Sequence, residues 1–305
     1  MPPPGDDALL EAAAGLLRRE AVQPGFLYVV ATPLGNLADI TLRALATLQQ
    51  CDRILCEDTR VTAKLLNHFT IHKPLVSCYR EREAARLPEI LAWLAAGEAL
   101  ALVSDAGTPA VRDPGAAVVE AVLAAGYAVE AVPGPSALTA AIAVAGEIGE
   151  AIEFAGYAPR RPAELADRLR AMRPGGSALI VYEAPHRLYA TIKALSAEFS
   201  ARRLVILREM TKLHAQRWAG TLAEFSPEMV PARGELVLIF PPPECFKVEI
   251  WDDERLRLEA APLRSAGYKP RPLAAELARR SGRAASEIYA LLIAKGALIK
   301  TSPYN

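Results

Sequence analysis

Three short turns rich in glycine, proline and small polar residues carry the residue types that could bind a ligand. Each turn follows an apolar, strand-like run and stands where a helix should begin. Such a turn presents backbone N–H groups to a ligand at the carboxyl end of a parallel strand. The turns are residues 31–37 after 26–30, residues 103–109 after 99–103, and residues 133–137 after 129–132. Together they predict one crevice with three walls.

The polar and small residues of these turns are the candidates for ligand binding. Asp105 follows its strand directly and precedes Ala106 and Gly107, so a ligand's amino or ribose group can approach its carboxylate closely. Each turn also has a simpler interpretation, a tight strand–helix connection, in which Asp105 only caps the following turn. The candidates are Pro33, Gly35, Asn36, Asp105, Ala106, Gly107, Thr108, Pro133, Gly134, Ser136 and Ala137.

The first turn excludes two common nucleotide sites. A dinucleotide site needs G-x-G-x-x-G after the first strand, whereas residues 32–36 read Thr-Pro-Leu-Gly-Asn. The sequence has no Walker A loop either. Residues 57–60, Glu-Asp-Thr-Arg, resemble a ribose-binding carboxylate, and equally a helix N-cap with a local ion pair. The turns therefore favour a ligand without phosphates, held by backbone groups and apolar contacts.

Two later strand-like runs each end in acidic and basic side chains that could face the same crevice. Glu183, His186 and Arg187 could fall on one side of the turn that they share. The alternative is a strand-end ion pair with a surface histidine. Arg208 and Glu209 project from opposite faces of a strand, so they cannot both line a site.

Length and composition limit the class of protein. A chain of 305 residues, 52% of them apolar, can form two domains with sizeable cores. No run of eighteen apolar residues occurs, and acidic residues stand where a signal peptide would be basic, which favours a cytoplasmic protein without a membrane span. The four cysteines have no CxxC spacing and the four histidines are scattered, so neither disulfides nor a metal site is expected. The net charge is zero, so a polyanion would need a local basic patch.

The order of apolar and amphipathic segments predicts an α/β fold class. Strands and helices alternate from residue 26, which is typical of a mostly parallel sheet. The later β-rich segments have short links, which favours a mixed sheet with antiparallel strands. Three consecutive prolines then mark a domain edge. The expected divisions are a poorly ordered tail (1–24, with a helical turn near 9–17), two α/β domains (25–135 and 136–242) with a crevice between them, and a basic helical extension (243–305).

Seven motifs, in order, resemble one protein family. They are Val-Ala-Thr-Pro-Leu-Gly-Asn-Leu-Ala-Asp-Ile-Thr at 30–41, Glu-Asp-Thr-Arg at 57–60, Ser-Asp-Ala-Gly-Thr-Pro at 104–109, Pro-Gly-Pro-Ser-Ala at 133–137, Tyr-Glu-Ala-Pro-His-Arg-Leu at 182–188, Arg-Glu-Met-Thr-Lys at 208–212 and Gly-Glu-Leu-Val-Leu at 234–238. Together they are similar to the ribosomal RNA small-subunit methyltransferase I family, within the tetrapyrrole methylase superfamily. The basic tail resembles the C-terminal extension of that family.

The resemblance implies a fold and an activity. The fold would be two α/β domains of tetrapyrrole-methylase type with S-adenosylmethionine between them, in a homodimer. The reaction would be methyl transfer to the ribose 2′-oxygen of a cytidine in the decoding region of small-subunit ribosomal RNA, as naked RNA or in the assembled subunit. The enzyme would align donor and acceptor and remove a hydroxyl proton, without a metal. The catalytic candidates are Glu183, Glu209 and His186 as bases, and Lys212 as the electrostatic stabiliser, with Arg187 as its alternative.

RNA would bind at basic patches. The chain departs from the family pattern at residues 79–83, where Tyr-Arg-Glu-Arg-Glu replaces a stretch that is usually rich in histidine, so arginine forks would contact phosphate there. In the tail, four apolar side chains would pack inward and leave arginines outside: Leu273, Leu277, Ile288 and Leu291. A solvated hairpin that only covers the second domain is the alternative. The RNA-binding candidates are Arg60, Arg80, Arg82, Arg160, Arg161, Arg187, Arg279, Arg280 and Arg283.

Two other functions share these features. A methylase of a tetrapyrrole small molecule would use the same turns, but its first turn tends to be richer in glycine than Thr-Pro-Leu-Gly-Asn. The other is a non-catalytic RNA-binding module of the same fold, against which the intact Asp105, Glu183 and Lys212 argue. The sequence favours the RNA methyltransferase.

Overall fold

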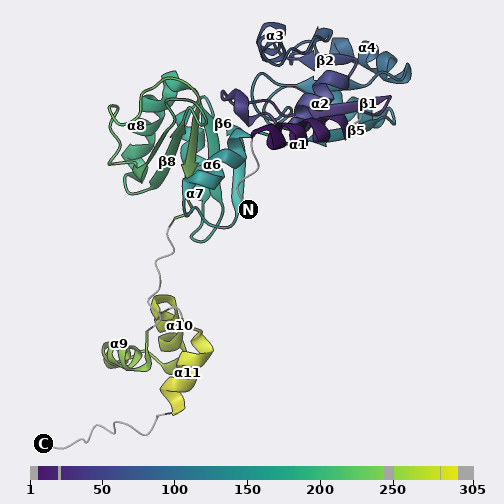
Figure 1. Cartoon of the computed structure of the whole chain (residues 1–305). Coiled ribbons are helices and arrows are strands. Elements are labelled where there is room, and N and C mark those ends of the chain that lie inside the picture. The colour runs from purple at the N-terminus through teal and green to yellow at the C-terminus, as the bar shows by residue number, and fades with distance from the viewer. Residues whose placement is uncertain (1–5, 20–21, 244–250, 282, 295–305) are drawn as a thin grey trace, which may run out of the picture. The chain divides into compact units, whose positions relative to one another are not determined.

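The computed structural model of the chain describes residues 6–19, 22–243, 251–281 and 283–294 (Figure 1). The chain divides into two compact units. One unit comprises Met1–Ala171 and Ala178–Pro241, and the other Met172–Ser177 and Pro242–Asn305. The first α/β domain (25–135) and the second (136–242), which the sequence predicts as separate domains, therefore share one unit, and the extension makes up most of the other.

The sheet of the first α/β domain is parallel throughout, as predicted. Its strands lie in the order β3 (Leu75–Ser77), β2 (Arg53–Cys56), β4 (Leu100–Val103), β1 (Phe26–Val30) and β5 (Ala128–Val132). From the neighbouring strands β1 and β4 the chain continues toward opposite edges of the sheet. A crevice opens at the carboxyl ends of two such strands. The first two turns that the sequence predicts to bind a ligand follow these strands.

Helices cover both faces of this sheet, because its strands carry apolar side chains on both sides. One face, which includes Val30, packs on α2 and α3, and the other, which includes Leu27, packs on α4 and α5. Three cysteines are free and buried here, as expected: Cys51, Cys56 and Cys78; Cys245 lies outside the described residues. The helices are α2 (Leu42–Gln50), α3 (Thr59–His68), α4 (Glu83–Ala95) and α5 (Ala116–Ala124).

The sheet of the second α/β domain is mixed, as predicted. Its strands lie in the order β6 (Ile152–Tyr157), β7 (Ala178–Glu183), β10 (Leu236–Phe240), β8 (Arg203–Arg208) and β9 (Gln216–Thr221). β6 and β7 are parallel, and the other pairs are antiparallel. Ala141 and Ala145 of α6 pack against Ile180 and Val205 of the sheet. The helices are α6 (Ala137–Ala145), α7 (Pro162–Ala171), α8 (Leu188–Phe199) and the 3-10 turn η2 (Pro185–Arg187).

The N-terminal segment, predicted as a poorly ordered tail with a helical turn near 9–17, contains a helix that is longer than that turn. Residues Asp6–Arg19 form helix α1, which packs against α2. The run is rich in alanine and leucine, which have the highest helix propensities, and a neighbouring helix supplies the packing that a short helix needs. Residues 1–5 and 20–21 of the expected tail lie outside the described residues.

The helical extension has an apolar core of its own. Trp251, Leu273 and Ile288 are buried together, Leu277 is also buried, and Leu291 packs against them, so the predicted inward positions are confirmed. The helices are α9 (Asp253–Ser265), α10 (Pro270–Ser281) and α11 (Ala285–Ala294). Among the helices of the described residues, none is both long and apolar enough to span a bilayer.

Candidate functional site

A cavity of about 430 Å³ in the first unit is lined by residues of both α/β domains. This volume falls in the range of small-molecule sites, about 300–1,000 Å³. The lining comes from the turn after β1, the ends of β2 and β7, the loop after β4, the start of α6, and the segment that leads into β10. The lining residues are Leu34, Glu57, Asp105, Ala106, Gly107, Thr108, Val111, Asp113, Ser136, Ala137, Tyr157, Tyr182, Glu183, Ala184, Pro185, Met210, Gly234, Glu235, Leu236 and Val237.

The three predicted turns join one another beside this cavity. Thr32 and Gly107 exchange backbone hydrogen bonds of 2.9 Å in both directions, so the first two turns form a short antiparallel bridge. Thr108 Oγ1 donates to the carbonyl of Pro135 at 3.0 Å, which ties the second turn to the third. The ends of the strands thus bring together, beside the cavity, three motifs that are separate in sequence.

Part of the predicted ligand-binding set lines the cavity. The lining members are Asp105, Ala106, Gly107, Thr108, Ser136 and Ala137; Pro33, Gly35, Asn36, Pro133 and Gly134 lie outside the lining. The first turn contributes Leu34 instead, whose side chain lies against Gly107. The Asn36 side chain accepts a hydrogen bond from the N–H of Ala38 at 3.1 Å and so caps the 3-10 turn η1 (Leu37–Asp39).

Carboxylates give the cavity a concentrated negative charge. Asp105 accepts a hydrogen bond from the N–H of Asp58 at 3.1 Å, and Glu57 lines the cavity beside it. Burial raises the pKa of both carboxyls, and neighbouring carboxylates raise it further, whereas the hydrogen bond from Asp58 lowers that of Asp105. Asp113 and Glu235 complete the acidic lining. Such a lining favours a cationic ligand.

Asp113 is the most perturbed of these carboxyls. Burial, and then the charge of Asp105, raise its pKa to about 6. Asp113 and Glu235 were not among the predicted site residues. A signal was present for both, because Asp113 follows the Ser-Asp-Ala-Gly-Thr-Pro motif closely and Glu235 stands inside the motif at 234–238. Glu57, left open between a ribose ligand and a local ion pair, lines the cavity, while its neighbour Asp58 caps α3 and pairs with Arg60.

Glu183, predicted as a general base, is enclosed at the end of β7. Its Oε1 accepts a hydrogen bond from the N–H of Ala184 at 2.8 Å, and its Oε2 accepts one from Thr191 Oγ1 at 2.7 Å. Arg187 Nε lies 3.4 Å from Oε1, and the Glu183 side chain has 0% exposure. Glu183 belongs to the cavity lining, but both of its oxygens already accept hydrogen bonds and its side chain is not exposed. This geometry does not favour Glu183 as the base, and its catalytic role stays a prediction.

His186 and Arg187 likewise follow the alternative interpretation of a strand-end ion pair with a surface histidine. His186 is exposed and is outside the cavity lining. Arg187 donates to the carbonyls of Ala158 and Pro159, besides its contact with Glu183. The guanidinium therefore braces the loop between β6 and α7, and the prediction that Arg187 itself binds RNA is not supported by its contacts.

Lys212 holds two carboxylates at the rim of the cavity. Its Nζ lies 2.9 Å from Glu209 Oε1 and 3.1 Å from Glu235 Oε2. Burial acts to lower the pKa of Lys212, but the hydrogen bonds to Glu209 and Glu235 outweigh it, so the pKa is raised. The Lys212 hydrogen bond lowers the pKa of Glu209. Lys212 thus stays a cation, and Glu209 is a weak base.

The turn that carries Lys212 has an unusual backbone. Glu209 and Thr211 both adopt positive φ, 51° and 66°, which is costly for residues other than glycine. Arg208 is buried and donates to the carbonyls of Arg233 at 3.1 Å and His214 at 2.9 Å, which fixes both ends of the turn. As predicted, Arg208 and Glu209 do not share the site, and neither belongs to the lining.

Residues 27–226 match the sequence profile of the Tetrapyrrole (Corrin/Porphyrin) Methylases. A protein of Neisseria meningitidis serogroup B named ribosomal RNA small subunit methyltransferase I is 44% identical over 238 residues, 75% of this chain and 80% of that protein. One of the same name from Synechocystis is 38% identical over 271 residues, 88% of this chain and 97% of its own length. The chain belongs to the ribosomal RNA small subunit methyltransferase I family. It is a methyltransferase.

Solved structures agree on the fold of this methyltransferase. The crystal structure of the methyltransferase CobJ matches with a TM-score of 0.54 at 24% identity, over 72% of this chain and 94% of that one. The X-ray structure of the cobalt precorrin-4 methyltransferase CbiF matches with a TM-score of 0.51 at 17% identity, over 70% and 94%. The predicted fold of two α/β domains of tetrapyrrole-methylase type is therefore confirmed.

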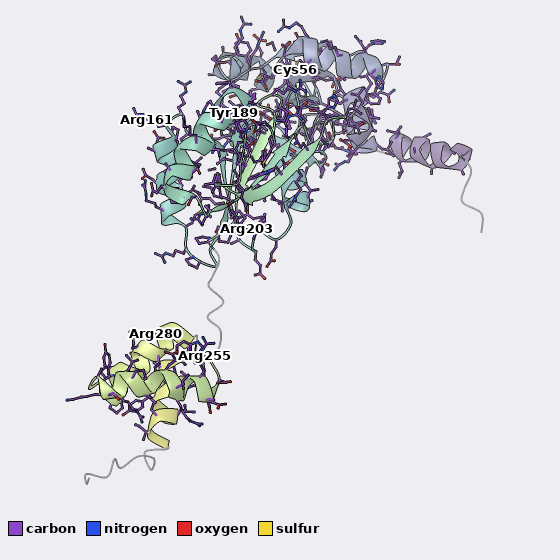
Figure 2. All side chains as sticks on the ribbon, turned by 90° about the vertical axis from the view of Figure 1, so that its left-hand side faces the viewer. Cys56, Arg161, Tyr189, Arg203, Arg255 and Arg280 are labelled. Atoms are coloured by element: carbon purple, nitrogen blue, oxygen red, sulfur yellow. The ribbon has the colours of Figure 1, made fainter. Side chains whose placement is uncertain are left out.

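Of the arginines predicted to bind RNA, some are exposed in a loop and others contact neighbouring groups of the methyltransferase. Arg160 and Arg161 are exposed in the loop between β6 and α7, and Figure 2 shows Arg161 at the edge of the second α/β domain. Arg60 pairs with its neighbour Asp58 at 2.6 Å. Arg80 donates to the carbonyl of Arg112, and Arg82 lies over the ring of Tyr79.

The arginines of the extension mostly serve its own structure. Arg280 pairs with Glu276 at 2.5 Å. Arg283 pairs with Asp253 at 2.6 Å and donates to the carbonyl of Trp251, so it links α9 to the start of α11. Arg280 is exposed, as predicted, and Arg283 is half-buried; the side chain of Arg279 lies outside the described part, and RNA binding by these arginines stays a prediction.

Proposed function

We propose that this methyltransferase moves a methyl group from S-adenosylmethionine to the ribose 2′-oxygen of a cytidine in the decoding region of 16S ribosomal RNA. The acid-lined cavity carries the proposal for the donor, because S-adenosylmethionine bears a sulfonium and an ammonium cation. The names of the relatives support ribosomal RNA of the small subunit as the acceptor. The decoding-region cytidine rests on the resemblance of the seven motifs.

The residues of the cavity fit such a donor. Glu57, Asp105 and Asp113 supply negative charge for its cationic groups, and Leu34 and Val237 supply apolar contact. Backbone N–H groups at the start of α6, at Ser136 and Ala137, offer donors for its polar oxygens. When bound, the donor supplies a methyl group on positively charged sulfur, which needs alignment with the acceptor more than further activation.

Side chains of the protein would then stabilise the ribose oxygen of the acceptor and take up its proton. The positive charge of Lys212 at the cavity rim stabilises the negative charge that develops on the ribose oxygen. Glu183 is enclosed and the pKa of Glu209 is lowered, so Asp113, whose pKa is about 6, is the lining carboxylate best matched to accept a proton near neutral pH. Asp113 therefore replaces Glu183 in our proposed scheme.

RNA would reach the cavity across exposed arginines of the second α/β domain. Arg160 and Arg161 stand in the loop that Arg187 fixes beside β7, and β7 ends at the cavity. The extension would add affinity through charges other than Arg280 and Arg283. We further propose a homodimer in the cytoplasm, in which exposed apolar side chains such as Leu123 of α5 and Val144 of α6 are covered by the second copy.

The decisive experiment uses small ribosomal subunits from cells that lack the protein. Purified protein, S-adenosylmethionine and these subunits should yield one 2′-O-methylated cytidine in the decoding region, located by mass spectrometry of RNA fragments. The Asp105→Ala variant should yield none. Methylation of a base, or of a tetrapyrrole but not of RNA, would refute the proposal. Light scattering that gives a monomer at micromolar concentration would refute the homodimer.

A further inference from the structure

The side chain of Arg112 attaches one loop of the first α/β domain to the second. The guanidinium of Arg112, in the loop between β4 and α5, donates to the carbonyl of Ala155 in β6. β6 has a bulge between Phe154 and Gly156 at this point. A β-carbon on Gly156 would overlap the Arg112 guanidinium, and the φ of Gly156 is +77°. The bulge and the missing side chain of the glycine together leave the space that the guanidinium fills.

A second arginine supports the first. Arg80, which follows β3, donates to the backbone carbonyl of Arg112 at 3.3 Å. Arg112 itself has a φ of 73°, a conformation that costs energy for a residue with a side chain and persists only where neighbours impose it. We call Arg80 and Arg112 the arginine bridge. It connects the end of β3 in one sheet to β6 in the other.

The bridge lies between two walls of the cavity. Val111 and Asp113, the neighbours of Arg112 in sequence, both line the cavity. Tyr157, the neighbour of Gly156, lines it from the other domain. Because the guanidinium joins these two segments, its loss releases both walls at once.

Arg80 of the arginine bridge also affects the pKa of two carboxyls that line the cavity. Arg80 lowers the pKa of Asp113 and of Glu57, which burial and neighbouring carboxylates raise. Three other groups act on Asp113: the Ser104 hydroxyl as a hydrogen-bond donor, and the carboxylates of Asp105 and Glu235. The charge of Asp113 in turn raises the pKa of the facing phenols of Tyr157 and Tyr182. Arg80 is the cation among the groups that shift Asp113.

We propose that Arg112 is a positioning residue for the methyl donor, with Arg80 as its support. Arg112 need not touch the donor: it sets the separation of the Asp113 and Tyr157 walls by holding its loop against β6. This proposal rests on the proposed function, because S-adenosylmethionine is taken as the ligand of the cavity.

The test compares variants of the full chain by calorimetric titration with S-adenosylmethionine and with its demethylated product. Arg112→Ala should weaken both affinities at least tenfold. Arg112→Lys should restore them to within about threefold of wild type, because an ammonium group can still donate to the carbonyl of Ala155. The matched control is Arg217→Ala, since Arg217 also donates to two backbone carbonyls, Val144 and Ala145, away from the cavity lining. It should leave both affinities unchanged.

A double-mutant cycle keeps the test independent of general loss of stability. Gly156→Ala must displace the guanidinium in the wild-type background, but in the Arg112→Ala background it meets only its own backbone strain. The two changes should therefore be strongly non-additive in donor affinity. Arg80→Gln should move the pH midpoint of donor binding upward, because Asp113 loses a cation that lowers its pKa.

The outcomes separate this inference from the proposed function. Wild-type protein that binds no S-adenosylmethionine would refute the proposed function itself. Wild-type binding with unchanged affinity in Arg112→Ala, or equal losses in Arg112→Ala and Arg217→Ala, would refute the arginine bridge alone. Additive effects of Arg112→Ala and Gly156→Ala would refute it as well.

Discussion

The side chain of Lys212 crosses the backbone of Gly35 so closely that a β-carbon on Gly35 would overlap it. Lys212 belongs to the second α/β domain and Gly35 to the first turn of the first domain. Arg112 and Gly156 make a similar contact with the domains exchanged, because there the arginine belongs to the first domain and the glycine to the second. Each domain thus lays one cationic side chain over a glycine of the other, and the cavity lining includes residues next to both contacts.

A side chain at Gly35 should disturb the reaction through Lys212. Gly35→Ala displaces the lysine stem and also strains a backbone whose φ is +142°. We expect turnover on small subunits to fall at least tenfold, with a smaller change in donor affinity, because Gly35 is outside the cavity lining. The matched control is Gly126→Ala, at a positive φ of 84° with no atom within 4 Å of the new carbon. Equal losses in both variants would mean that strain alone is responsible.

Removal of the Lys212 charge should cut turnover and leave donor binding near wild type. Lys212→Met keeps the stem over Gly35 but leaves Glu209 and Glu235 without their shared cation. The folded pKa of Glu209 is lowered, so its contribution to stability is present above about pH 4.5 and is lost as the pH falls through the folded pKa. Urea unfolding should therefore show a wild-type advantage at pH 7 that shrinks toward pH 3. Full turnover in Lys212→Met would exclude an electrostatic role.

Asp113→Asn should stabilise the protein while it weakens donor binding. The folded pKa of about 6 exceeds that of the unfolded chain, so the ionised carboxylate opposes folding increasingly as the pH rises through this range. After allowance for its partial exposure, the gain should be about 1–2 kcal/mol at pH 8 and vanish near pH 3. Donor affinity of the wild type should rise with pH around 6, because the carboxylate attracts the cationic donor. A variant that is destabilised at pH 8, or a flat pH profile of wild-type binding, would contradict this account.

Glu183→Gln should lower stability more than activity. The substitution removes the charge that faces Arg187 and leaves one of the two donors, Ala184 N–H or Thr191 Oγ1, facing an amide NH₂ group. The free energy of unfolding should fall by about 1–3 kcal/mol, measured by urea denaturation. Turnover per folded molecule should stay within about threefold of wild type. A loss of 100-fold without any change in stability would instead identify Glu183 as the base.

Arg160 and Arg161 should contribute to RNA affinity through phosphate contacts. The Arg160→Ala, Arg161→Ala double variant should bind small-subunit RNA less tightly, and its log K should depend less steeply on log salt, by roughly 0.7 per lost contact on a single strand. Arg283→Ala serves as the control, because that side chain is held by Asp253 and the carbonyl of Trp251. At a temperature at which the extension stays folded, Arg283→Ala should leave the salt slope unchanged. An identical slope in the double variant would exclude this loop from the RNA interface.

Local sequence patterns were enough to predict most of the strands and helices and the turns that meet beside the cavity. An apolar run predicts a strand, and the small and polar residues that follow it predict the turn at its end, because turn chemistry and side-chain period are local properties. This holds for the runs that end in Thr-Pro-Leu-Gly-Asn, Ser-Asp-Ala-Gly-Thr-Pro and Pro-Gly-Pro-Ser-Ala. The parallel sheet, the mixed sheet and the helical extension followed from the same local patterns. The alanine-rich N-terminal run was misjudged, because its helix depends on a partner, α2, that no local pattern shows.

Which polar groups are accessible, and what each one contacts, depends on the packing of segments that are distant in sequence. Glu183 looked like a free strand-end acid until Thr191, Ala184 and Arg187 enclosed it. Asp113 was not among the predicted site residues, and its raised pKa comes from burial and from the charge of Asp105. Burial and charge proximity arise from segments that are distant in sequence, and they set protonation and access. The sequence shows which ionisable groups are present, whereas their pKa values and their accessibility depend on the packing around them.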